Sequence, residues 1–481
     1  MALTLARDRM FTCSLWLVQG NELMAKPGLS IFFDQGTLRL DGEGIDQLLG
    51  HPGLRRDSSE KIWRLPGNGY RGIIEAAVAL GISLNDQARK YERRLFSFYE
   101  TREPFAHQRE AVDAWRLSGG KGVIVLPTGT GKSFVAMLAI RQTGRPALVV
   151  CPTIDLMNQW QKQLEKTFGE PVGMAGGGCQ EWRDITVTTY ESAYLQVERW
   201  GDKFGLLIFD EAHHLPGSSH QLAARGAIAP FRLGLTATLE REDGLHSILL
   251  DLIGPTVFRR EINDLAGEYL ANYSTNRIWV ELLGDERIKY EEANLVYQGY
   301  LNQQGYSLGS QGGWKRFIWE STRNSEAKSA FRAFLEQKKI LHQCEGKMVA
   351  LENILEQHRK DRILVFTVDN ATVHQISRRF LVPSLTHNTR SSERKDLLQG
   401  FQEGRLPVLA TSRVLNEGVD VPAAGVAVVL SGSGTVREHV QRLGRILRKY
   451  EEKQAILYEL VVKDTREEMV SQRRRRHDAY Q

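Results

Sequence analysis

The chain has 481 residues, more than one hydrophobic core organises, so we expect about three domains. Its 42% hydrophobic and 25% charged residues are typical of a globular protein, and a net charge of +5 permits nucleic-acid binding without arguing for it. The four cysteines are scattered without a CxxC pair, which argues against a disulfide framework or a zinc site and fits a reducing cytoplasm. No apolar run is long enough to span a membrane, so we expect a cytoplasmic protein with no membrane partner.

Residues 1–98 contain no catalytic motif and predict a small α+β domain. Short apolar runs alternate there with Gly- and Asn-containing turns, and the helix is stopped by Gly81. The expected elements are strands over 30–34, 37–40 and 62–66 and a helix over 70–80. A charged and aromatic stretch, 90–99, then forms a linker to the next domain.

Residues 99–265 alternate between apolar strands and helices, which predicts a parallel α/β sheet. The expected strands are 122–126, 147–151, 185–189, 206–209 and 231–235. Polar residues directly follow each strand, at the carboxyl edge where open α/β sheets bind their ligands. We therefore expect a site at this edge, built from several strand ends.

The first of these strands leads into the sequence LPTGTGKS, from Leu126 to Ser133, and then into a helix. Glycines let the loop curl so that its N–H groups point inward, and the helix N-terminus adds positive potential. Lys132 would reach the β and γ phosphates of a nucleotide, and the Ser133 hydroxyl would ligate Mg²⁺. The strict phosphate-loop pattern has Gly in place of Leu126, and an ordinary glycine turn is the alternative. The expected nucleotide-binding residues are Thr128, Gly129, Thr130, Gly131, Lys132 and Ser133.

The tetrapeptide Asp210-Glu211-Ala212-His213 follows another apolar strand. One carboxylate, Asp210, would hold Mg²⁺, and the other, Glu211, would orient and deprotonate an attacking water molecule. Alone, the tetrapeptide fits a solvated acidic turn equally well. A phosphate loop earlier in the same sheet makes the catalytic interpretation much stronger.

Residues 266–342 lose the alternating pattern and predict a linker with an inserted helical hairpin. Helices are expected over 290–300 and 325–340, with a turn rich in glycine and aromatic residues between them, over 305–319. Residues 343–481 return to the α/β pattern and predict a second lobe. Its expected strands are 363–367, 408–411, 426–430 and 455–462. The predicted fold class is α/β, with two parallel-sheet lobes.

A basic sequence, QRLGRILR from Gln441 to Arg448, lies in the predicted second lobe. Arg445 and Arg448 are three residues apart and share one face of a helix. Arginine is suited to the charge that develops on a transferring phosphoryl group. A plain basic helix surface is the alternative, and the choice depends on whether the second lobe closes over the first.

The motifs LPTGTGKS, DEAH, Thr236-Ala237-Thr238, Gly418-Val419-Asp420 and QRLGRILR, in this order, resemble those of superfamily 2 helicases and translocases. Within that superfamily the chain most resembles the XPB-like DNA helicases, especially the compact archaeal and bacterial forms. Arg241-Glu242-Asp243 matches the Arg-Glu-Asp motif of that family, and so does the Leu-Pro start of the loop. The insertion resembles the family's thumb, and the N-terminal unit resembles its damage-recognition domain.

The resemblance implies two RecA-like lobes and an ATP-dependent DNA helicase or translocase of 3′–5′ polarity that opens or tracks duplex DNA in repair. It implies ATP and Mg²⁺ as cofactors, duplex or forked DNA as partner, a nuclease as a further partner, and a place on the nucleoid if the source is prokaryotic. An RNA helicase, a duplex translocase with little strand separation, a nucleotide switch and an inactive DNA-binding scaffold are the alternatives. RNA or DNA stimulation of ATP hydrolysis discriminates among them.

The resemblance also assigns roles to single residues. Gln108 would recognise adenine, although a polar residue at a helix start is the simpler alternative. His213, Thr236 and Thr238 would couple ATP to DNA, or serve as structural hydrogen-bonding groups. Arg241, Glu242 and Asp243 would meet DNA or pair with one another. The remaining assignments are Gln441, Arg445 and Arg448 as catalytic residues, Gly418 and Asp420 at the cleft, and Thr153, Thr189 and Thr411 on loops that touch the nucleic-acid backbone.

Overall fold

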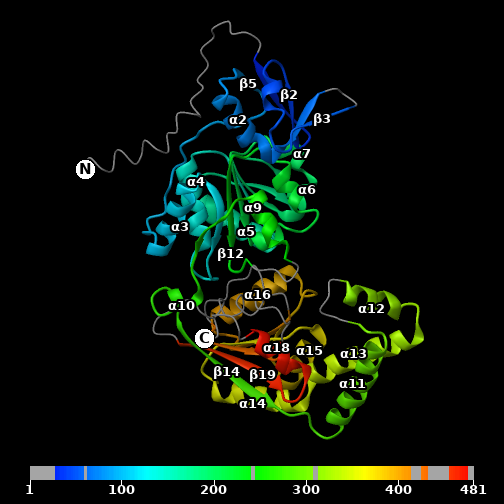
Figure 1. The fold of residues 1–481 in the computed structure, drawn as a ribbon. Helices are drawn as coiled ribbons and strands as arrows, with labels where there is room; N and C mark the ends of the chain where they lie inside the picture. Colours follow the sequence, from blue (N-terminus) through cyan, green and yellow to red (C-terminus); the bar gives the residue numbers. More distant parts are fainter. Residues whose placement is uncertain are drawn as a thin grey trace. The chain divides into compact units, whose positions relative to one another are not determined.

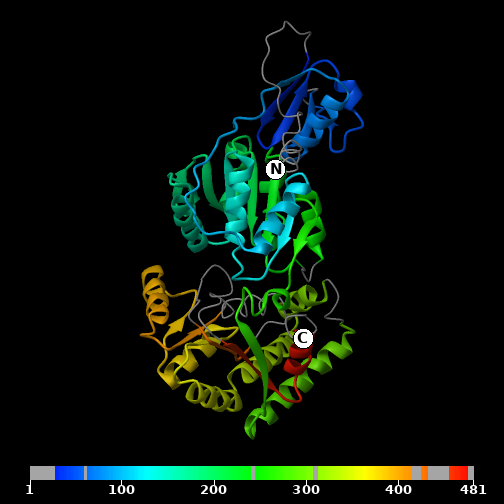
Figure 2. The ribbon, with the colours of Figure 1, turned by 90° about the vertical axis from the view of Figure 1, so that its left-hand side faces the viewer.

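The computed structural model describes residues 28–58, 62–239, 244–306, 312–412, 424–431 and 454–474. They form two compact units (Figures 1 and 2). The first holds a small N-terminal domain and an eight-stranded sheet, and the second holds a six-stranded sheet with its helices. The predicted α/β class with two parallel-sheet lobes is confirmed. Within the described part of the chain, no helix combines the length and apolarity needed to cross a bilayer.

The N-terminal domain is a five-stranded sheet in the order β3-β4-β2-β1-β5, with one helix on one face. Its elements are β1 Leu29–Asp34, β2 Thr37–Asp41, η2 Ile45–Leu48, β3 Arg55–Arg56, β4 Trp63–Pro66, η3 Gly67–Gly69, α2 Tyr70–Ala79 and β5 Leu84–Asp86. Alternate residues such as Leu38 and Leu40 point to one face and pack with Ile73 of α2. The three predicted strands and the helix are confirmed, whereas the short strands β3 and β5 were not predicted.

The N-terminal domain is joined to the larger sheet by close backbone packing. A Cβ atom at Gly67 would lie 2.7 Å from the carbonyl group of Gly226, so the contact depends on glycine. Arg71 Nη1 donates to the carbonyl oxygen of Gly119 at 2.6 Å. Ile228, from the larger sheet's unit, belongs to the hydrophobic core of the small domain. The two therefore share a core.

The eight-stranded sheet has the order β13-β6-β12-β11-β7-β10-β8-β9, and all its strands except β9 are parallel (Figure 1). Helices cover both faces (Figures 1 and 2). Its elements are α3 Ala106–Leu117, β6 Lys121–Val125, α4 Lys132–Thr143, β7 Ala147–Cys151, α5 Ile154–Phe168, β8 Gly173–Gly176, β9 Cys179–Glu181, β10 Ile185–Thr189, α6 Tyr190–Leu195, α7 Val197–Trp200, β11 Leu206–Asp210, η4 Ala212–His214, α8 Gln221–Arg225, β12 Phe231–Thr236, η5 Leu245–Ile248, α9 Leu249–Leu252 and β13 Thr256–Arg259. The five predicted strands are confirmed, and they are the buried centre of the sheet.

The six-stranded sheet is parallel, in the order β14-β19-β18-β15-β17-β16. The elements of the second unit are α10 Ile262–Leu265, β14 Asn272–Val280, α11 Asp285–Gln303, α12 Gly313–Ser321, α13 Ser325–Gln343, α14 Glu345–Gln357, β15 Ile363–Phe366, α15 Asn370–Phe380, β16 Ser384–Leu385, α16 Ser391–Gln402, β17 Val408–Thr411, β18 Val426–Val429, β19 Gln454–Val462 and α18 Arg466–Arg474. The four predicted strands are confirmed. β14 was not predicted, and it pairs with β19 along its whole length although it lies in the stretch assigned to the linker and insertion.

The helical insertion contains α11, α12 and α13. The prediction of a turn throughout residues 305–319 was wrong, because residues 313–321 form α12. Glycines and aromatic residues are weak helix formers, yet Trp314 packs against Phe334 of α13 and Phe317 packs against Phe331 of the same helix. This burial, rather than helix propensity, stabilises α12.

Candidate active site

Five neighbouring strands of the eight-stranded sheet, β6, β12, β11, β7 and β10, end at one edge. They are parallel and in register, with Asp210 opposite Leu235 and Thr189 opposite Cys151. The polar groups that follow them are therefore gathered at this carboxyl edge. The structure brings together here the DEAH and TAT motifs and the threonines after β7 and β10, as the sequence predicts.

The loop after β6 has the backbone conformation of a phosphate-binding turn. Gly129 and Gly131 have φ angles of 91° and 82°, in the left-handed region that favours glycine. Thr130 Oγ1 donates to the carbonyl oxygen of Pro127 at 2.8 Å and closes the turn. Lys132 and Ser133 then open α4, whose first N–H groups have no partner within the helix. The hydroxyl of Thr128 is buried and has no hydrogen-bond partner among the described residues, as expected where a polar ligand belongs.

Asp210, the last residue of β11, is held in one orientation by its neighbours. It is 8% exposed, and its Oδ2 accepts a hydrogen bond from Trp160 Nε1 at 2.8 Å. Its Oδ1 accepts from the backbone N–H of Glu211 at 3.0 Å, and the Tyr190 hydroxyl donates to its carbonyl oxygen at 2.9 Å. Sequence reasoning missed Trp160 and Tyr190, because nothing in an apolar helix pattern marks a side chain that contacts a carboxylate on a distant strand.

Glu211 adopts a left-handed backbone conformation, with φ 48° and ψ 54°. A non-glycine residue there costs on the order of 1 kcal/mol, and such conformations cluster at functional sites. Its Oε2 is buried and lies 3.5 Å from His213 Nδ1. Asp210 keeps the extended conformation of β11, whereas the left-handed conformation of Glu211 turns the backbone out of the strand.

His213 links the DEAH motif to the TAT motif. It is fully buried, and its Nδ1 lies 3.1 Å from Thr236 Oγ1. The Thr236 hydroxyl donates to the carbonyl oxygen of Thr238 at 2.7 Å, so it accepts the hydrogen from His213 Nδ1. This assigns the proton to Nδ1 and directs it to Thr236, while Glu211 Oε2 lies 3.5 Å from the same nitrogen without a hydrogen bond to any described residue.

The other predicted residues make local structural contacts. Gln108 is fully buried in α3, and its Oε1 accepts from the backbone N–H of Phe105 at 3.0 Å. Thr153 and Thr189 cap the N-termini of α5 and α6 with their hydroxyl oxygens. Thr411 is buried at the end of β17. Their roles toward nucleotide and nucleic acid stay predictions.

Eight predicted site residues lie outside the described residues. They are Arg241, Glu242, Asp243, Gly418, Asp420, Gln441, Arg445 and Arg448.

The residues present fit a nucleotide-bound Mg²⁺. In the described ranges, no group of three or more His, Cys, Asp or Glu residues could hold a metal ion alone. Mg²⁺ that arrives with a nucleotide needs only one or two protein ligands beside phosphate oxygens and water. Asp210, with its orientation fixed by Trp160, and Ser133, in the first turn of α4, supply oxygen ligands of the required kind.

Two protein-family models match the chain. One, described as type III restriction enzyme, res subunit, matches residues 101–241, and the other, described as ERCC3/RAD25/XPB C-terminal helicase, matches residues 318–481. A Sulfurisphaera tokodaii protein named DNA 3′-5′ translocase XPB2 is 37% identical over 434 residues, which cover 84% of this chain and 98% of that protein. The chain belongs to the XPB family. The predicted family resemblance is thereby confirmed.

Other XPB relatives are longer than the matched region. The Mycobacterium tuberculosis protein named DNA 3′-5′ helicase XPB is 29% identical, and the match covers 75% of this chain and 60% of that protein. The Drosophila melanogaster relative, named general transcription and DNA repair factor IIH helicase/translocase subunit XPB, is 27% identical over 74% of this chain and 43% of its own length.

Solved structures support the helicase fold. The Pyrococcus furiosus Hef helicase domain covers 77% of this XPB-family chain and 97% of its own, with a TM-score of 0.51 and 19% identity. Saccharomyces cerevisiae Dbp5 bound to RNA and ADP BeF3 has a TM-score of 0.52 and 14% identity, and covers 79% of this chain. At these identities the likeness concerns the fold alone.

Proposed function

We propose that this XPB-family chain is an ATP-hydrolysing DNA translocase or helicase of 3′–5′ polarity, which opens or tracks duplex DNA during repair. The observation that carries the proposal is the chain of contacts from Glu211 through His213 to Thr236. It joins a catalytic carboxylate to the end of a neighbouring strand, so that nucleotide chemistry and movement of the strand-end loops are coupled. The names of the XPB relatives support DNA as the polymer.

In this proposal the substrate ATP is held by the loop from Thr128 to Ser133, whose backbone N–H groups and Lys132 face its phosphates. Gln108, in the first turn of α3, would accept a hydrogen bond from the adenine amino group, by family resemblance. Ser133 and Asp210 would hold Mg²⁺, which, when bound, supplies positive charge for the phosphate oxygens.

Glu211 acts as the general base. It orients a water molecule toward the terminal phosphate and takes up its proton at a side-chain oxygen. His213, with its proton held on Nδ1 by Thr236, lies 3.5 Å from Glu211 Oε2 and would link the charge of that carboxylate to Thr236 and Thr238. We assign Arg445 and Arg448 to stabilisation of the charge on the transferring phosphoryl group, by family resemblance.

The N-terminal domain is proposed to contact the DNA backbone. Across its sheet, Arg39 lies opposite Arg64, and Arg64 lies opposite Arg55, on the face away from α2. Like charges directly opposite each other are unfavourable in a sheet unless a counter-charge is present. Asp34 and Asp57 supply one for Arg64, whereas exposed Arg55 makes no ion pair within the described part of the domain.

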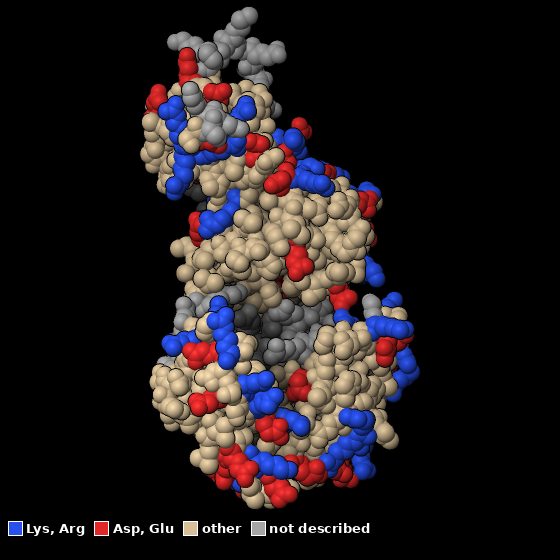
Figure 3. Space-filling view, turned by 90° about the vertical axis from the view of Figure 1, so that its right-hand side faces the viewer, with Lys and Arg blue, Asp and Glu red and all other residues tan. Residues whose placement is uncertain are grey.

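Figure 3 shows lysine and arginine side chains gathered on the surface of this domain, with acidic side chains among them. A phosphate backbone would neutralise the row of arginines without reading sequence. The domain would thus position DNA, while the strand-end threonines Thr153 and Thr189 contact the backbone at the motor lobe. The helical insertion, α11 to α13, is proposed to act as a thumb, and a nuclease partner is proposed from the family alone.

A strand-displacement assay tests the polarity. Duplexes with either a 3′ or a 5′ single-stranded tail are incubated with the protein and ATP, and release of the labelled strand is followed. Release from the 3′-tailed duplex alone is expected. Preference for the 5′ tail, or for an RNA tail over DNA, would contradict the proposal. Displacement of a third strand from a triplex without duplex separation would identify the duplex-translocase alternative.

A further inference from the structure

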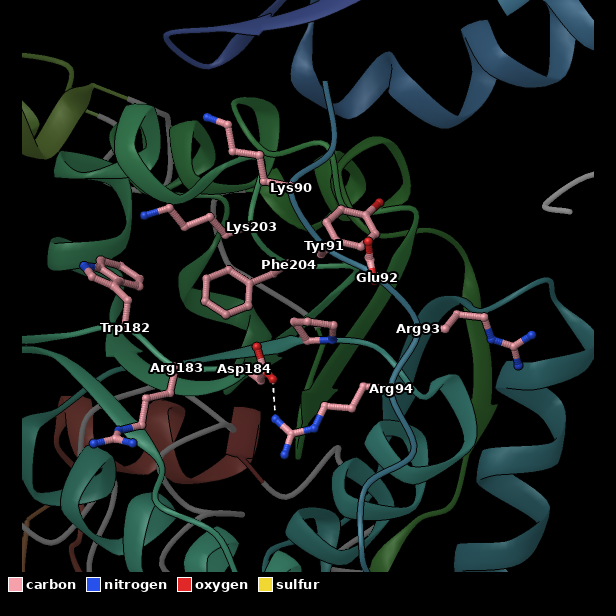
Figure 4. Close-up of a pocket in the computed structure, with 11 residues that line it drawn as sticks. Lys90, Tyr91, Glu92, Arg93, Arg94, Trp182, Arg183, Asp184, Lys203 and Phe204 are labelled. Carbon is pink, nitrogen blue, oxygen red and sulfur yellow. Dashed lines mark hydrogen bonds and ion pairs between the residues drawn. The ribbon is translucent and has the colours of Figure 1, made fainter. Parts of the chain in front are cut away.

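A cavity lies at the amino edge of the eight-stranded sheet, opposite the edge that carries Asp210 (Figure 4). Its volume is about 570 Å³. Pro146 precedes β7, Asp184 precedes β10 and Phe204 lies just before β11, and these three strands are neighbours. The cavity is therefore at the amino edge, about one strand length, roughly 16 Å, from the carboxyl edge that holds Asp210.

The cavity is rigid and has an aromatic floor. The linker segment 90–94 forms one wall, and the Lys90 backbone N–H donates to the carbonyl oxygen of Asp202 at 2.8 Å. Tyr91 and Phe204 are 6% and 2% exposed, and the Trp182 ring centroid lies 6.1 Å from that of Phe204. Since backbone hydrogen bonds and buried rings hold the walls, a ligand would find the cavity already formed.

Basic side chains outnumber acidic ones in the lining of the cavity. Lys90 pairs with Asp202 and Arg183 with Glu181, and Arg94 pairs with both Glu170 and the lining residue Asp184. Arg93 and Lys203, by contrast, make no ion pair with any residue that the structure describes. The charged residues that line the cavity are Lys90, Arg93, Arg94, Arg183 and Lys203, against Glu92 and Asp184.

A further arginine side chain, Arg145, lies close to Arg93 of the linker segment and to Arg89. Burial lowers the pKa of Arg145, Tyr91 acts in the opposite direction, and Arg93 and Arg89 lower the pKa further. Figure 4 shows Lys90 and Lys203 extending to the same side of the cavity, with Trp182 next to them. An anionic group placed there would face the Lys203 ammonium group and an indole ring, beside the Lys90–Asp202 ion pair.

We propose that this cavity docks an acidic peptide segment of a partner protein. An aromatic or aliphatic side chain of the segment packs on Trp182 and Phe204, and a flanking carboxylate pairs with Lys203. A nucleic-acid strand fits less well, because Lys203 and Arg93 are the only two lining cations without an ion pair to a described residue, whereas a strand needs a row of cations for its successive phosphates. The cavity also lies away from the edge that carries Thr153 and Thr189.

The test measures fluorescence anisotropy with the full chain and a short labelled peptide in which aspartates and glutamates flank one phenylalanine. Lys203→Glu and Trp182→Ala are each expected to weaken binding by about tenfold or more, and Lys203→Glu also to reduce its salt dependence. The matched control Lys162→Glu reverses an exposed charge on α5, outside the cavity, and is expected to leave affinity unchanged. Melting temperatures of the variants establish that each is folded.

Lys132→Ala, in the nucleotide loop, is expected to leave peptide binding intact, so failure of the motor proposal would not affect this result. The proposal is overturned if wild type and both cavity variants bind the peptide equally. It is also overturned if single-stranded or duplex DNA, rather than the peptide, binds the wild type and loses affinity in Lys203→Glu and Trp182→Ala.

Discussion

Arg232 on β12 is a fully enclosed cation, and its replacement by methionine is predicted to destabilise the ATP-binding unit. The side chain is 2% exposed and donates to four backbone carbonyl groups rather than to a carboxylate. The acceptors are Ala224 at 2.8 Å, Ala227 at 2.7 Å, Ala229 at 3.1 Å and Leu252 at 2.7 Å. It therefore joins β12, which ends in the TAT motif, to the segments beside the N-terminal domain.

The predicted loss in the free energy of unfolding is the difference between the contribution of the four hydrogen bonds and the cost of burying the charge. Hydrogen bonds from a charged donor contribute about 1.5–3 kcal/mol each, so four amount to about 6–12 kcal/mol. Burial lowers the pKa of Arg232 from its usual 12.5 to about 10, which corresponds to about 3 kcal/mol against the charged form. Arg232→Met keeps some packing but removes all four donors, and a net loss of about 4 kcal/mol is expected.

Hydrogen–deuterium exchange followed by mass spectrometry measures the loss of stability at β12 itself. A local measurement is needed because a chain with several domains does not unfold in a single two-state step. A loss of about 4 kcal/mol makes exchange in β12 roughly a thousandfold faster. Arg232→Lys, with three donors, is expected to give an intermediate rate. The matched control is Arg225→Met, which removes an exposed cation paired with Asp251 at 3.1 Å and is expected to cost less than about 1 kcal/mol. Equal exchange in Arg232→Met and Arg225→Met would refute the reasoning.

Three further predictions concern the site and the second unit. Trp160→Phe keeps the ring but removes the hydrogen bond to Asp210, so kcat for ATP hydrolysis is expected to fall about tenfold with little change in KM; a larger effect on KM would indicate a role in binding instead. His213→Ala breaks the contact with Thr236, so ATP binding should persist while stimulation by DNA is lost, as measured by nucleotide titration and steady-state ATPase rates. Burial raises the pKa of Asp369, but hydrogen bonds from His342 and Thr372 outweigh it and lower the pKa to about 2. This stabilisation is complete above pH about 4, where an unfolded aspartate is ionised, and is lost as pH falls through 2, so Asp369→Asn should flatten the fall in melting temperature over that range.

The strands that were predicted correctly are mostly apolar, because they are buried in the centre of a sheet. Runs such as 147–151 and 206–209 are apolar because both faces of a central parallel strand are covered, and the structure confirms them. β14 carries polar residues along most of its length because it is an edge strand, and it was therefore missed. The glycine-rich strand β8 was missed for a related reason, since glycine does not favour strands on its own.

In the site, too, short sequence motifs predicted some features, whereas contacts between residues far apart in the sequence were missed. The two glycines of the nucleotide loop are close to each other in sequence, and so are Asp210 and Glu211, so each short pattern predicts a local feature of the site. The contacts that orient them come from far away: Trp160 lies on a different helix from Asp210, and its role follows only from the fold. The left-handed conformation of Glu211 likewise has no signal in the sequence, because glutamate is not a residue that favours it.

The central claim is that the Asp210–Glu211 carboxylates and the LPTGTGKS loop form an ATP-hydrolysing motor that acts on DNA. The most direct measurement is the steady-state ATPase rate of the full chain without polymer, and with single-stranded DNA, forked duplex, blunt duplex or RNA. We predict stimulation by DNA, strongest with the forked or blunt duplex, weaker stimulation by RNA, and loss of activity in Lys132→Ala. Stimulation by RNA alone, or DNA-stimulated hydrolysis retained in Lys132→Ala, would contradict the account.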